Sequence, residues 1–246
     1  MNRKLLQLLG DNVRADRSAP AVRAVDNHVY VYDVIDPDWG ASAQALIEAL
    51  KPLAGLPVSL HINSPGGDVF EARAMVAAVR AHGAPVTVYI DGLAASAATY
   101  LALAGDQVHI QDGAMMMVHN SWTFSWGNKA ELRKTADLLD KIDGTIAADY
   151  ARKTGASSDQ IAAWMDAETW FTAAEAKAAC FVDSVITAPP ADATQASAAR
   201  WNLSAYANAP KAPEPKAPTD ADIAAHAERI ARLNRSRLAA LLQPRT

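Results

Sequence analysis

The chain has 246 residues, of which half are hydrophobic and a fifth are charged. This length and composition are ordinary for a globular protein with one substantial domain and an appendage. Its 23 basic and 27 acidic side chains give a formal net charge of -4, so nothing in the charge calls for nucleic acid or an anionic membrane as partner.

Composition divides the chain into four parts. Residues 1–26 are polar and mixed and predict an N-terminal arm, and residues 27–188 alternate strand and helix signals. Residues 189–218 are rich in Ala and Pro, which predicts an extended, disordered linker, and residues 219–243 have the apolar spacing of an amphipathic helix. The apolar run at residues 5–9 is too short for a signal peptide or a membrane span, so we expect a cytoplasmic protein.

Strand and helix signals alternate along the body. Apolar runs and alternation predict strands over 28–35, 58–62, 86–90, 107–110 and 115–119. Helical spacing, with Gly and Pro as stop signals, predicts helices over 41–50, 69–81, 95–104, 130–153 and 157–165. Strands separated by helices favour parallel pairing with right-handed crossovers, and therefore an α/β fold.

Ser96 stands where a strand, a tight turn at Gly92 and a helix rich in Ala meet. Backbone N–H groups at the start of a helix have no partner within it and can stabilise an oxyanion, while small neighbours admit a substrate carbonyl. The pattern therefore fits a nucleophile. It fits a tightly packed Ala-rich helix equally well.

His119 comes 23 positions after Ser96, at the end of an apolar run. A histidine at a strand end can reach a neighbouring helix start and accept a serine proton, although a hydrogen-bonded structural role is the alternative. No two histidines have metal-site spacing with acids, so we expect no zinc. We interpret the remaining histidines as structural: His28, His61, His82, His109 and His226.

A glycine pair closes the strand at 58–62, in the sequence Asn-Ser-Pro-Gly-Gly at residues 63–67. Such a turn can bring backbone amides close to a ligand without interference from a Cβ atom. It is also ordinary loop punctuation.

Taken in order, these segments resemble the ClpP serine peptidases. The resemblance rests on Ile-Asn-Ser-Pro-Gly-Gly at 62–67, Gly-Leu-Ala-Ala-Ser-Ala at 92–97 and Met-Val-His-Asn at 117–120. Two further blocks, at 168–176 and 181–185, are similar to the family's segment with the triad acid, the next helix and the closing strand. The resemblance covers about residues 27–188 and implies a ClpP/crotonase-like spiral of ββα units.

The resemblance also implies a mechanism. Ser96 would be the nucleophile and His119 its general base, while the backbone amides of Gly67 and Ala97 would hold the oxyanion. No metal or organic cofactor is implied, and any ATP-driven unfolding would belong to a partner. The implied assembly is a ring-like homo-oligomer with the helix at 130–153 at the ring contact.

One branch, the head maturation proteases of tailed bacteriophages and prophages, is particularly similar. The similar segments are residues 91–98, 119–122, 126–128 and 165–170. This branch implies that scaffold or capsid precursor proteins are the substrate, in the host cytoplasm or the procapsid. The helix at 219–243 would then bind a partner.

The acid departs from the family pattern. The family's triad acid is usually Asp, whereas the gap-free match here places Glu168 at that position, with Asp166 as the alternative. Three rival functions stay open: a crotonase-type acyl-CoA enzyme, a Ser/Lys peptidase with Lys141 or Lys153 as base, and an inactive shell subunit of the same fold.

Overall fold

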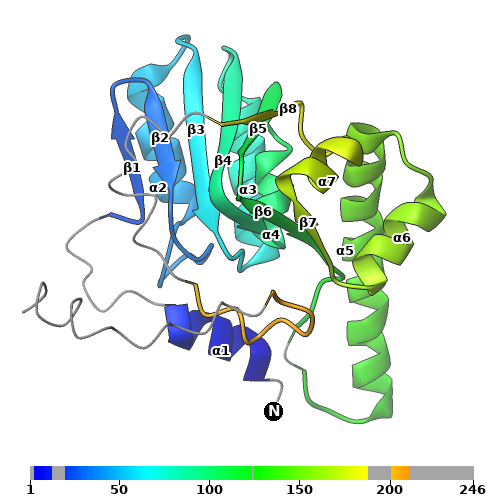
Figure 1. The fold of residues 1–246 in the computed structure, drawn as a ribbon. Helices are drawn as coiled ribbons and strands as arrows, with labels where there is room; N and C mark the ends of the chain where they lie inside the picture. Colours follow the sequence, from blue (N-terminus) through cyan, green and yellow to red (C-terminus); the bar gives the residue numbers. More distant parts are fainter. Residues whose placement is uncertain (1–2, 13–19, 124, 188–200, 211–246) are drawn as a thin grey trace, which may run out of the picture. The chain divides into compact units, whose positions relative to one another are not determined.

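The most apolar runs of the sequence form the central strands of one sheet. The computed structural model describes residues 3–12, 20–123, 125–187 and 201–210. The main run of strands has the order β1-β2-β3-β4-β5-β8, with β1 antiparallel to β2 and the other neighbours parallel (Figure 1). Their bounds are β1 Val22–Val25, β2 His28–Val31, β3 Val58–Ser64, β4 Val86–Ala95, β5 Gln107–Gln111 and β8 Ser184–Ile186.

The helices that follow β2, β3 and β4 pack on the sheet through their apolar sides. Ser42 and Asp68 cap two of them, because their side chains accept hydrogen bonds from backbone N–H groups of the first turn. Leu46, Met75 and Leu101 are fully buried against the strands. The bounds are α2 Ala43–Leu50, the 3₁₀ turn η1 Lys51–Leu53, α3 Val69–Arg80 and α4 Ala97–Ala102.

Strand β4 is longer than the sequence predicts, and its two halves have different partners. Thr87 to Ile90 pair with β5, whereas Leu93 to Ala95 pair with β6 (Met115–Val118). β6 pairs in turn with the antiparallel β7 (Thr169–Thr172). The carboxyl ends of β4 and β6 therefore lie side by side.

A long helix, α5 (Lys129–Thr154), lies beside this second branch of strands (Figure 1). Asn128 and Glu131 form a capping box at its start, and Gly155 ends it in a left-handed conformation with φ 72°. It is followed by α6 (Ser158–Asp166) and, after β7, by α7 (Ala173–Ala178). Among the residues that the structure describes, no helix is long and apolar enough to cross a membrane.

The two ends of the expected body differ from the sequence-based boundaries. Strand β1 falls within the predicted arm, yet it extends the sheet. Helix α1 (Arg3–Asn12) precedes it, and its Leu8 is buried. The stretch 201–209 falls within the predicted linker, but Ala205 and Tyr206 are buried against the body in a cluster that includes Leu8.

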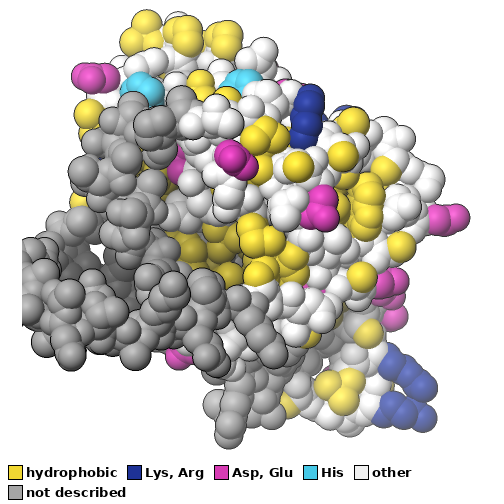
Figure 2. All heavy atoms as spheres, viewed as in Figure 1, with side chains coloured by type: hydrophobic (Ala, Val, Ile, Leu, Met, Phe, Trp, Pro, Cys, Tyr) yellow, Lys and Arg dark blue, Asp and Glu magenta, His cyan; other side chains and the backbone are white. Residues whose placement is uncertain are grey.

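This difference has a physical reason, since apolar side chains at Trp201, Leu203 and Tyr206 interrupt the Ala- and Pro-rich composition and pack in that cluster. The rest of the predicted linker lies outside the described residues, apart from Pro210, and so does the predicted helix at 219–243. On the face shown in Figure 2, charged side chains are scattered and apolar ones gather near the centre.

Candidate active site

Ser96 occupies a strained turn between β4 and α4. Its φ of 57° and ψ of -122° are unusual for a residue with a side chain. The surrounding contacts hold this conformation: the Ser96 N–H donates to the Met117 carbonyl oxygen at 2.9 Å. The buried Thr99 Oγ1 lies 2.6 and 2.7 Å from the carbonyl oxygens of Ala94 and Met117. The turn is thus fixed against β6.

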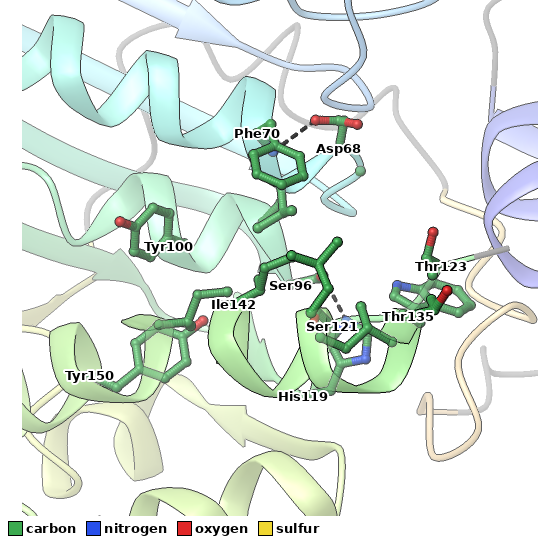
Figure 3. Close-up of a pocket in the computed structure, with 17 residues that line it drawn as sticks. Asp68, Phe70, Ser96, Tyr100, His119, Ser121, Thr123, Thr135, Ile142 and Tyr150 are labelled. Atoms are coloured by element: carbon green, nitrogen blue, oxygen red, sulfur yellow. Dashed lines mark hydrogen bonds between the residues drawn. The ribbon is translucent and has the colours of Figure 1, made fainter. Parts of the chain in front are cut away.

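His119 follows the last residue of β6. Because Ala95 pairs with Met117, the residues just past both strand ends come together, and Ser96 Oγ lies 2.7 Å from His119 Nε2 (Figure 3). A neutral imidazole with Nε2 unprotonated accepts a hydrogen bond from a serine hydroxyl and can take its proton during nucleophilic attack. The pair predicted from the sequence is therefore assembled in the structure.

The glycine turn lies directly against the nucleophile turn. A Cβ atom on Gly66, which has φ 89°, would stand 2.5 Å from the Ala95 carbonyl oxygen and 2.9 Å from Ser96 Cβ. A Cβ on Gly67 would stand 2.0 Å from the Ile35 carbonyl oxygen. Only glycine allows this approach, which brings the Gly67 backbone next to the same cavity that Ser96 and Ala97 line.

An apolar cavity of about 150 Å³ begins at Ser96 and His119 (Figure 3). Helix α5 contributes much of its wall through Leu138, Leu139, Ile142, Ile146 and Tyr150. Burial raises the pKa of both Tyr100 and Tyr150 above the usual tyrosine value, so both hydroxyls stay neutral at physiological pH. The cavity therefore suits an apolar side chain.

Both Glu168 and His119 adjoin the last residue pair of the β6–β7 ladder in the chain. Val118 pairs with Thr169, so the next positions along the antiparallel ladder are His119 and Glu168. Glu168 accepts hydrogen bonds from the backbone N–H groups of Ala207, at 3.0 Å, and Asn208, at 2.6 Å. Asp166, the alternative acid, accepts one from Asn120 Nδ2 at 2.7 Å.

The segment 201–209 packs on this site, and the sequence analysis did not predict that contact. The Tyr206 ring lies edge-on to His119 and next to Trp122, with centroid distances of 5.4 and 5.6 Å. The available signal was a tryptophan and a tyrosine within an otherwise Ala- and Pro-rich stretch.

Lys153, one of the two lysines considered as an alternative base, has a carboxylate as its partner. Lys153 Nζ lies 2.8 and 2.9 Å from the two carboxylate oxygens of Asp183, in an ion pair on α5 and the turn before β8. Among the described residues, no group of three or more His, Cys, Asp or Glu side chains has the arrangement of a metal site.

Comparisons with known proteins agree with this geometry. The family model for Clp protease matches residues 25–189. The chain is 33% identical over 128 residues to an ATP-dependent Clp protease proteolytic subunit of Pleurastrum terricola, covering 51% of this chain and 65% of that protein. It is 33% identical over 132 residues to proteolytic subunit 1 of Corynebacterium jeikeium, covering 53% of this chain and 70% of that protein.

A solved structure shows the same fold. A ClpP1 mutant from Listeria monocytogenes superposes with a TM-score of 0.59 at 23% sequence identity, covering 66% of this chain and 92% of that one. The fold expected from the sequence is thus confirmed. Because the family model spans well over half of the sequence, the chain belongs to the Clp protease family.

Proposed function

We propose that this chain is a serine endopeptidase in which Ser96 is the nucleophile and His119 the general base. The observation that carries the proposal is the 2.7 Å contact between Ser96 Oγ and His119 Nε2 at the mouth of an apolar cavity. A peptidase of this kind needs a nucleophile, a base in hydrogen-bonding reach and space for a substrate side chain, and all three meet here.

The proposed reaction follows from these positions. Ser96 Oγ attacks the peptide carbonyl while His119 takes the hydroxyl proton, and the C–N bond then breaks as His119 returns that proton to the leaving amine. Water, activated by His119, hydrolyses the acyl-enzyme. The Gly67 and Ala97 N–H groups are the proposed oxyanion donors, because their backbones line the cavity beside Ser96.

Glu168 is the proposed orienting acid. Glu168 directly precedes Thr169, which pairs with Val118 next to His119, and this supports the role, since a carboxylate near the imidazole can fix it and stabilise its cation. The Ser/Lys alternative with Lys153 is disfavoured by the ion pair of Lys153 with Asp183.

The proposed substrates are scaffold or capsid precursor proteins, cleaved during phage head maturation. The similarity of residues 91–98, 119–122, 126–128 and 165–170 to that branch supports this assignment. We further propose a ring-like homo-oligomer formed through α5, on which Leu132 and Leu138 are 45% and 51% exposed.

The decisive experiment uses a fluorogenic peptide with an apolar residue before the scissile bond. Ser96→Ala should lower the cleavage rate at least about 10³-fold while the protein stays folded. Ser158→Ala, at an exposed serine at the start of α6, is the matched control and should cleave at the wild-type rate. Wild-type turnover by folded Ser96→Ala protein would exclude this nucleophile, and no cleavage by any form would favour the inactive shell subunit.

A further inference from the structure

The tyrosine at position 206 is enclosed by the aromatic side chains of the candidate site. Its ring is only 5% exposed and lies 5.4 Å from His119, 5.6 Å from Trp122 and 5.8 Å from Trp170 between ring centroids. The contacts with His119 and Trp170 are edge-to-face, which is a favoured arrangement of aromatic rings. We call His119, Trp122 and Trp170 the aromatic cage.

The hydroxyl of Tyr206 reaches the catalytic turn. It donates a hydrogen bond at 2.5 Å to the carbonyl oxygen of Pro65, which directly precedes the glycine pair beside Ser96. Burial raises the pKa of this hydroxyl above its usual value, so the hydroxyl keeps its proton at neutral pH. Tyr206 thus contacts His119 through its ring and the turn next to Ser96 through its hydroxyl.

The two residues after Tyr206 are held mainly through their backbone. Glu168 accepts hydrogen bonds from the N–H groups of Ala207 and Asn208, and Asn208 Nδ2 donates to the Ala167 carbonyl oxygen at 2.7 Å. Backbone N–H groups are common to all peptides. The carboxylate of Glu168 could therefore bind another polypeptide in the same way.

The preceding residues are anchored by side chains specific to this chain. Trp201 Nε1 donates to Asn63 Oδ1 at 3.0 Å. Asn202 and Asn12 exchange two hydrogen bonds: the Asn202 N–H donates to Asn12 Oδ1 at 2.7 Å, and Asn12 Nδ2 donates to the Asn202 carbonyl oxygen at 2.9 Å. Figure 1 shows this segment, in orange, beside α1. These contacts hold residues 201–208 at the site in the free chain.

The segment and the apolar cavity occupy neighbouring positions. Among the described residues, the cavity lining includes Ser96, His119 and Trp122, but neither Tyr206 nor Trp170. An endopeptidase substrate must extend past the nucleophile in both directions, so it needs a second binding position outside the cavity. Residues 206–208 lie at such a position.

We propose that the aromatic cage and Glu168 form a subsite for an aromatic residue of a peptide substrate, and that Tyr206 fills it as a tethered, competing ligand. This proposal rests on the proposed peptidase function and names a substrate feature for it. A tethered ligand competes at a high effective concentration, so substrate must displace residues 206–208 to enter. Removing the Tyr206 ring should therefore open the subsite.

The first test measures binding without catalysis. A fluorescein-labelled synthetic peptide of residues 200–209 is titrated into full-length Ser96→Ala protein and into the Ser96→Ala/Tyr206→Ala double variant, with fluorescence anisotropy as readout. The double variant should bind at least about tenfold more tightly, a factor that corresponds to about 1.4 kcal/mol. A peptide with Ala in place of its tyrosine should lose this binding.

Controls separate displacement from unfolding. Ser96→Ala/Ser158→Ala changes an exposed serine at the start of α6, outside the segment, and should bind the peptide as weakly as Ser96→Ala does. If thermal unfolding shows that the Tyr206→Ala double variant does not fold, Ser96→Ala/Trp201→Ala, which loosens the segment at Asn63, should show the same gain. If folded Ser96→Ala protein and the folded Ser96→Ala/Tyr206→Ala variant bind the peptide with equal affinity, the proposal is overturned.

The second test measures cleavage in a background with Ser96 intact. Two peptides place the tyrosine before or after the scissile bond. Tyr206→Ala should raise kcat/KM about tenfold for one of them, and much less for the same peptide with alanine in place of the tyrosine. Binding gained without any Ser96-dependent cleavage would refute the peptidase function and leave the subsite intact. Ser96-dependent cleavage with no effect of Tyr206→Ala on either measurement would refute the subsite alone.

Discussion

His61 and His119 differ in their surroundings, and of these two only His119 lines the cavity described above. His61, in the middle of β3, has Nδ1 2.8 Å from Asp91 Oδ2 and stacks between Tyr30 and Tyr89. His119, just past β6, has Nε2 2.7 Å from Ser96 Oγ at the cavity mouth. The partner of His61 is a carboxylate, whereas the partner of His119 is the hydroxyl of the proposed nucleophile.

The comparison teaches that strand position separates a structural histidine from a reactive one. His61 is 5% exposed within a row of aromatic rings, where a second hydrogen bond from Tyr32 also reaches Asp91. His119 stands where β4 and β6 end together, so its ring faces a turn and a cavity instead of neighbouring strands. Substitutions at the two histidines should therefore affect different properties.

The largest expected effect is on catalysis. His119→Ala should lower peptide cleavage at least about 10³-fold, because the general base is lost, whereas folded His61→Ala protein should stay within about tenfold of wild type. Steady-state rates on one fluorogenic peptide compare the two. A larger loss for His61→Ala than for His119→Ala would reverse the assignment.

The next effect concerns Glu168, the proposed orienting acid. Glu168→Gln should lower kcat about 10²-fold or more, because the carboxylate that stabilises the imidazolium is removed. Asp166→Asn, two residues away with Asn120 as partner, is the matched control and should cost less than about fivefold. The pH profile of kcat/KM distinguishes orientation of His119 from a structural role. If Asp166→Asn is the more damaging change, Asp166 is the acid.

Stability should depend more on His61 than on a histidine in a loop, such as His82. His61→Ala removes a hydrogen bond to a buried carboxylate and two ring contacts, and should lower the unfolding free energy by about 2–4 kcal/mol. His82→Ala, at a loop histidine that contacts the Leu56 carbonyl oxygen, should cost less than about 1 kcal/mol. Urea unfolding measures both. Equal costs would show that the row of rings around His61 contributes little.

The smallest expected effect concerns Asp183, whose carboxylate is exposed, whereas the carboxylate of Asp91 is buried. Burial alone would raise the pKa of Asp183, but hydrogen bonds from Lys153 and the Val108 N–H lower it below its usual value. A lowered pKa contributes stability that is present above about pH 4 and is lost as the pH falls through the folded-state pKa.

The stability of Asp183→Asn as a function of pH checks the direction of this pKa shift. Since Asp183 is 43% exposed, solvent screening limits the effect of Asp183→Asn to about 1 kcal/mol at pH 7. Unfolding curves at pH 7 and about pH 2.5 should show this cost at the higher pH and almost none at the lower. A cost that grows on acidification would contradict the sign of the shift.

Much of the fold could be predicted because its signals are local. The apolar runs at 58–62 and 86–90 are central strands, and the predicted helix at 130–153 is within one residue of α5 at each end. The extension of β4 to Ala95 was missed, because Gly92 reads as a turn although it continues the strand. Its pairing with β6 depends on tertiary contacts that composition does not record.

The site was predicted only in part. The residues around Ser96 and His119 gave no decisive local signal. The pair was indicated because the segments that contain them match the ClpP motifs in content and in chain order. The partners of Tyr206 lie far away in sequence, from Pro65 to Trp170, so a stretch rich in Ala and Pro predicted a linker. Contacts made over such distances are outside the reach of window-based patterns.

Labelling with a fluorophosphonate probe tests the central claim most directly, because the probe reacts only with an activated serine. The account predicts a single labelled position, Ser96, identified by peptide mass spectrometry. Labelling should be lost in Ser96→Ala, strongly reduced in His119→Ala and unchanged in Ser158→Ala. Labelling at another serine, or undiminished labelling of folded His119→Ala protein, would contradict the account.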